Sequence, residues 1–162
     1  HAAQRAVSVQ QFLQPGQDRV HRGRVAADRG VDALDEAIDA AASGEVRRLP
    51  HLIDRLMGSG VSAFQIQNPM LRHFQQLQLM RQEMDRDGRS VKDIVARRRV
   101  HFSRQGALEA ALSLWSQDSI AAVLRRMETD ILKSRKEAAL QQVITFRLLM
   151  DIGVEAARSR RN

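Results

Sequence analysis

The 162-residue sequence contains no cysteine and no tyrosine, and it has only three prolines and one tryptophan. Without cysteine there is no disulfide, no thiolate metal ligand and no cysteine nucleophile, and such a composition favours a reducing compartment. No apolar run approaches the roughly 20 residues that a membrane-spanning helix needs. We therefore expect a cytoplasmic protein that makes no membrane contact.

Motifs that carry chemistry are missing as well. Neither the G-x-x-x-x-G-K-[ST] loop nor the G-x-G-x-x-G loop occurs, and the five histidines are not spaced as metal ligands. His73, beside Phe74, is best explained as a hydrogen-bonded packing residue. We predict no catalytic, cofactor-binding or metal-binding residue and a chain that is not an enzyme by itself, with an unrecognised helical active site as the least favoured reading.

Apolar residues recur almost everywhere at helical spacing, and no strand pattern is visible, so the predicted fold class is all-α. Gly44 is a natural helix stop, Pro50 fits a first turn, and Pro69 predicts a kink or a helix start near Asn68. The early and central helices are predicted over Val31–Ser43, Glu45–Met57, Ser62–Asp87 and Val91–Arg99.

The stretch Val100–Ser134 predicts two consecutive amphipathic helices joined at a tight corner. Leu108 and Trp115 lie on the apolar stripe of the first helix, and Ser116 can cap the second. We expect Trp115 and Phe74 to be buried packing residues, because each belongs to an apolar stripe.

The last predicted helix, Ala138–Ala157, follows a break near Ser134–Glu137 and is apolar on more than one side. One face carries Leu140, Val143, Ile144, Leu148 and Ile152. A helix that is apolar on several sides is normally central to a bundle or buried in an interface. We take Phe146, Leu149 and Met150, which lie on other faces, as candidate subunit-interface residues.

The net charge of +7 is concentrated between Arg89 and Arg104, where six basic residues face a single acid, Asp93. Such a patch can meet phosphate, an acidic protein surface or only solvent. We take Arg97, Arg98 and Arg104 as candidate interface residues.

One stretch goes further than periodicity. From Arg99 the chain reads Arg-Val-His-Phe-Ser-Arg-Gln, then a helix ending Leu-Ser-Leu-Trp-Ser, then a second helix closing with Asp-Ile-Leu-Lys-Ser at Ser134. This order resembles the C-terminal region of the bacterial DNA polymerase III delta subunit family. The corner Ala41–Glu45 and the segment Leu71–Leu77 are similar to further parts of that family, so the resemblance covers about Val31–Ala157.

The resemblance implies a non-catalytic assembly domain of the clamp loader, which opens the sliding clamp and places it on primed DNA. Residues 31–157 would be the helical collar, residues 1–30 a partly ordered remnant of the lid-like region, and residues 158–162 a frayed tail. The implied partners are the gamma/tau and delta prime subunits, with DNA met only through the complex. The clamp itself would be met only through an N-terminal domain, which we expect before His1. The alternative from another class is a stand-alone basic helical module that binds nucleic acid.

Overall fold

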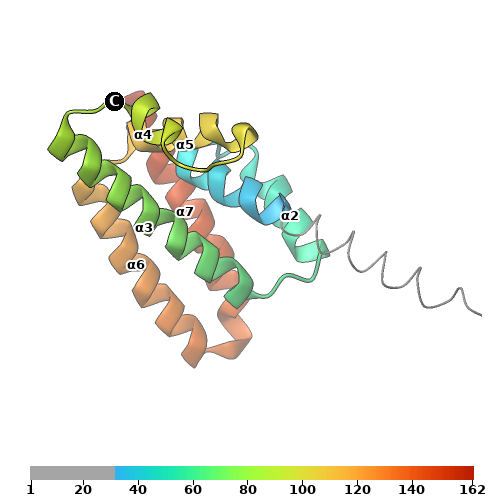
Figure 1. Ribbon diagram of the computed structural model, residues 1–162. Coiled ribbons are helices and arrows are strands. Elements are labelled where there is room, and N and C mark those ends of the chain that lie inside the picture. The colour runs from blue at the N-terminus through green and yellow to red at the C-terminus, as the bar shows by residue number, and fades with distance from the viewer. Residues whose placement is uncertain (1–31) are drawn as a thin grey trace, which may run out of the picture.

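The computed structural model describes residues 32–162, which form a bundle of α-helices without any strand (Figure 1). The all-α prediction is confirmed for this part of the chain. The remnant expected at residues 1–30 lies outside the described residues. After a helix of residues 32–43 come α2 (Leu49–Gly58), α3 (Ala63–Asp87), α4 (Val91–Ala96), α5 (Phe102–Leu114), α6 (Gln117–Lys136), the 3-10 turn η2 (Ala138–Leu140) and α7 (Gln141–Arg161).

The long helices α3, α6 and α7 run side by side, and the short helices α4 and α5 cross one end of them (Figure 1). Their stripes meet in one continuous core, which includes Phe74 and Trp115. These two side chains are 0% and 1% exposed, so their predicted burial is confirmed. Their rings meet edge to face with centroids 5.2 Å apart, an arrangement that aromatic quadrupoles favour.

The helix of residues 32–43 ends in a Schellman motif. Gly44 has φ +77°, its N–H donates to the Ala41 carbonyl (3.2 Å), and the Glu45 N–H donates to the Ala40 carbonyl (2.8 Å). An added Cβ at Gly44 would lie 2.7 Å from the backbone nitrogen of Ala157. Glycine is thus required here twice, for its backbone conformation and for the close approach of α7.

The two remaining terminal carbonyls of that helix are satisfied from far along the chain. The Trp115 indole Nε1–H donates to the Ala42 carbonyl (2.8 Å), and the Arg160 guanidinium donates to the Ser43 carbonyl (2.6 Å). The last four carbonyls of a helix lack intrahelical donors, so each needs a partner of this kind. These bonds join the helix of residues 32–43 to the α5–α6 corner and to α7.

Serine caps explain where three helices begin. Ser62, Ser90 and Ser116 each accept a hydrogen bond from a backbone N–H in the first turn of α3, α4 and α6, respectively. Ser62 forms a full capping box with Gln65. Because this cap starts α3 at Ala63, Pro69 lies inside the helix, and the alternative start near Asn68 is wrong.

One part of the prediction for the C-terminal helix is confirmed and two parts are not. The break is confirmed, since α6 ends at Lys136 and α7 begins at Gln141. The residues predicted to share one face are divided in the structure, however: Leu148 and Ile152 are buried, whereas Leu140 and Val143 are 43% and 63% exposed. Residues 158–161, expected to fray, continue α7, and Arg160 is fixed by its bond to Ser43.

Candidate interaction surface

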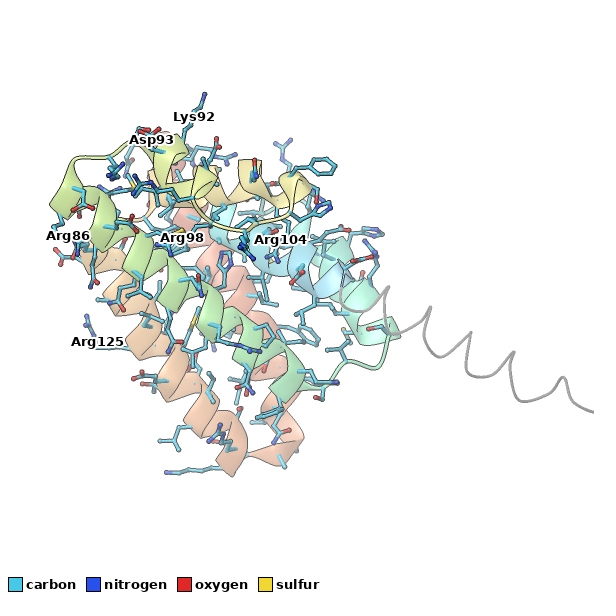
Figure 2. All side chains as sticks on the ribbon, viewed as in Figure 1. Arg86, Lys92, Asp93, Arg98, Arg104 and Arg125 are labelled. Carbon is cyan, nitrogen blue, oxygen red and sulfur yellow. The ribbon has the colours of Figure 1, made fainter. Side chains whose placement is uncertain are left out.

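The basic stretch before α5 lies against acidic side chains of the same chain. Arg98 donates to Glu83 on α3 with a distance of 2.7 Å between Nη2 and Oε2, and Arg97 lies 3.6 Å from the same carboxylate. Arg98 and Arg104 line the same cavity, whereas Figure 2 shows Lys92 pointing away from the bundle. Arg97 and Arg98 therefore hold the end of the short helix α4 against α3 through contacts within the chain itself.

Arg104 forms the most extensive ion pair of the molecule's described part. Its guanidinium binds Asp39 through two nitrogens, at 2.8 and 2.9 Å, and Asp35 through the third at 3.0 Å. The hydrogen bond with Asp39 raises the pKa of Arg104. Burial raises the pKa of Asp35, although the nearby Arg104 charge acts in the opposite direction. Bidentate pairs of this kind fix orientation, so Arg104 ties α5 to the helix of residues 32–43.

A cavity of about 260 Å³ opens beside this ion pair. Arg72, His73 and Gln76 of α3 line it together with apolar side chains such as Met80 and Leu108. The His73 Nε2 is buried and has no hydrogen-bond partner, contrary to the prediction of a hydrogen-bonded packing residue. Burial lowers the pKa of His73 to about 4, so the ring is neutral at physiological pH.

The predicted apolar interface on α7 divides into core and surface. Leu149 is fully buried in the core at 0% exposure, so its assignment to an interface is wrong. Phe146 and Met150 pack against the core but stay partly exposed. Val143, predicted on the same face as the buried Leu148 and Ile152, is the exposed apolar residue beside them.

Sequence reasoning missed a groove at the C-terminal end of α7, with a volume of about 580 Å³. Its apolar part consists of Val46, Val154 and Ala157, and its charged rim includes Arg47, Arg48, Arg160 and Arg161. The signal was present in the arginine-rich end of the chain. The prediction that residues 158–162 fray removed those arginines from any ordered surface.

A buried polar cluster was missed too, because its members lie on three separate helices. The Gln67 Nε2 of α3 donates to the Ser134 hydroxyl of α6 (2.9 Å) and to the Thr145 hydroxyl of α7 (2.8 Å). Each hydroxyl in turn donates to a carbonyl of its own helix. The cluster therefore joins three helices, and the Gln67 Nε2 and both hydroxyls all have acceptors.

Within residues 32–162 no group of histidine and acidic side chains is arranged to hold a metal ion, and no helix is long and apolar enough to cross a membrane. No family model, no curated protein and no solved structure matches this chain.

Proposed function

We propose that this chain is a non-catalytic assembly domain of the DNA polymerase III delta type, whose role is to join the clamp-loader pentamer. It would associate with gamma/tau-type subunits and delta prime, and bind neither ATP nor the sliding clamp by itself. The proposal rests on the sequence resemblance and on where the residues that carry it lie in the fold.

The observation that carries the proposal is a convergence. The three separate parts of the resemblance supply Ala42, Phe74 and Trp115, and these residues meet in one buried cluster. The indole lies edge-on to Phe74 and donates its hydrogen to the Ala42 carbonyl, joining three elements. Contact among the three similar segments is what a shared architecture requires. This convergence favours a shared architecture over a chance likeness of helical patterns.

The surface of α7 supports an assembly role as well. Val143 is 63% exposed, and Phe146 and Met150 are partly exposed, so the C-terminal helix presents apolar side chains outward as well as inward. A specific interface usually buries more than about 1,000 Å² around an apolar centre. These side chains can supply such a centre.

The alternative, a stand-alone nucleic-acid-binding module, has less support. It relied on the basic stretch, in which Arg97, Arg98 and Arg104 already bind carboxylates of the same chain. Phosphate would have to compete with carboxylates that lie 2.7 Å from Arg98 and 2.8 Å from Arg104. The paired arginines are better explained as internal ties.

Co-elution tests the proposal. The chain is mixed with gamma/tau-type subunits and delta prime and separated by size-exclusion chromatography, with and without the clamp. We expect a mixed complex. The clamp alone should leave the elution volume of the chain unchanged, and titration of the chain with the clamp or with ATP should release no heat of binding. No co-elution with any loader subunit would refute the assembly role, and direct ATP or clamp binding would refute the domain assignment.

A matched pair of variants places the contact. Val143→Asp puts a charge on the α7 surface, and Leu79→Asp makes the same change on α3 at a side chain that is 59% exposed. We expect Val143→Asp to weaken association at least about tenfold and Leu79→Asp to leave it unchanged. Equal behaviour of the two variants would remove α7 from the interface.

A further inference from the structure

The outward face of α7 carries a continuous apolar stripe. Its members follow one another at intervals of three or four residues, which places them on one side of an α-helix. They are Val143, Phe146, Met150, Val154 and Ala157. Each is exposed or partly exposed, and from first to last they span about 21 Å of helix.

The stripe ends in the basic groove. Val154 and Ala157 line the groove, so its apolar part continues the stripe without interruption. The one acidic residue in the lining, Glu45, already binds Arg48 at 2.7 Å. Arg47 and Arg161, both exposed, add positive charge at the rim. The surface is therefore apolar along its length and cationic at the C-terminal end of α7.

We propose that this surface is the docking site for an amphipathic helix that carries acidic side chains at its N-terminal end. The inference deepens the proposed function and rests on it for the source of that helix, a neighbouring loader subunit. The apolar face of the helix would lie on the stripe, and its carboxylates would meet Arg47 and Arg161. Acidic residues favour the first turn of a helix, so the docked helix runs antiparallel to α7.

The observations favour this occupant over others. Nucleic acid would bind the arginines but leave the apolar stripe of Val143, Phe146 and Met150 exposed to water, so that this area would contribute nothing to the free energy of binding. Residues 1–31 of the chain carry five arginines and two aspartates, so their charge is the same as that of the groove. An acidic amphipathic helix satisfies both halves of the surface at once.

The absence of cysteine allows a clean test, since one introduced cysteine carries a single fluorophore. Val154→Cys places an environment-sensitive dye in the groove, and Leu132→Cys places it on α6 at a side chain that is 54% exposed. The probe is a synthetic helical peptide of about 18 residues, long enough to cover the stripe. It has leucine at the heptad contact positions and glutamate in its first two turns. Control peptides have lysine for glutamate, or the same composition scrambled.

We expect the glutamate peptide to bind and to change the emission at position 154 but not at position 132. The lysine and scrambled peptides should bind at least about tenfold more weakly. Joint reversal of Arg47 and Arg161 to glutamate should weaken binding of the glutamate peptide about tenfold at low salt, with a smaller effect at high salt. The same reversal at Lys133 and Arg135, exposed on α6, should leave binding unchanged.

Several results would overturn the inference: no binding, equal response of both dyes, indifference to the Arg47 and Arg161 reversal, or a dye response caused by duplex DNA or by dimerisation of the chain. Failure of the proposed function is distinguishable from these. In that case the peptide binds as expected, but the chain does not co-elute with any loader subunit.

Discussion

Trp115 offers the sharpest test of how the bundle is held together. Its side chain is 1% exposed, contacts Phe74 edge-on, and donates to the otherwise unpaired end of the helix of residues 32–43 at the Ala42 carbonyl. Two substitutions separate these contributions. Trp115→Phe keeps a ring in the core but removes the N–H donor, whereas Trp115→Ala removes both ring and donor.

The magnitudes follow from what each change leaves behind. Trp115→Phe leaves the buried Ala42 carbonyl without its donor, which costs about 1–3 kcal/mol. Trp115→Ala also opens a cavity and removes an aromatic pair, so we expect a total loss of about 3–5 kcal/mol. Phe102→Ala is the control, because Phe102 is 78% exposed and its truncation should change stability by less than about 0.5 kcal/mol.

The assay is urea unfolding followed by far-UV circular dichroism, since the two tryptophan variants lack the chain's single indole. We expect the order wild type, Phe variant, Ala variant in decreasing stability, with similar denaturant slopes. A Phe variant as stable as the wild type would refute the claim that the indole hydrogen bond holds the helix end. A loss below about 1 kcal/mol in the Ala variant would refute the burial itself.

Two other predictions concern single positions. Gly44→Ala should cost more than the roughly 1–2 kcal/mol of a left-handed alanine, because the added Cβ meets the Ala157 backbone. Gly88→Ala is the control: at φ +63° with nothing within 4 Å of the added Cβ, it should cost only the backbone strain. Equal losses of stability for the two variants in thermal or urea unfolding would contradict the close approach at Gly44. His73 has a folded-state pKa of about 4, below the ordinary 6.5, so the unfolded chain binds the proton more readily and stability should fall by up to about 3 kcal/mol as pH drops from 6.5 to 4. His73→Leu should flatten the pH dependence of unfolding in this window, and an unchanged slope would mean that the ring is accessible to protons in the fold.

Helix ends were predictable where a local signal sets them, but not elsewhere: α2 begins at Leu49 rather than Glu45, and α4 ends at Ala96 rather than Arg99. Gly44 takes the left-handed conformation, Pro50 lies in the first turn of α2, and Ser90 and Ser116 cap the helices they precede, as expected. Pro69 shows the limit of such signals. The capping box at Ser62 starts α3 at Ala63, six residues before Pro69, so the proline lies inside the helix instead of marking its start.

The faces of α7 could not be read from the sequence. Apolar residues occur on nearly every side of this helix, so periodicity alone does not say which side meets the core. In the structure Gly153 lies against Leu49 and Ala41, and Ala157 lies against Gly44. These close approaches rotate Leu149 into the core and turn Val143 outward. Contacts between residues about 100 positions apart therefore decide which side chains remain for a partner.

Charge shows the same dependence on the fold, and it bears most directly on function. The acidic run around Asp35 and Asp39 and the basic run of residues 89–104 are 65 residues apart in sequence at the Arg104–Asp39 pair, yet Arg104 joins them through three short contacts. Each run taken alone predicts a charged surface, but together they neutralise one another and stabilise the packing of α5. A partner is therefore better sought where cations gather beside exposed apolar surface. The groove formed by Arg47, Arg161 and Val154 is such a place, so charge reversal there should disturb binding without loosening the bundle, whereas reversal at Arg104 should do the opposite.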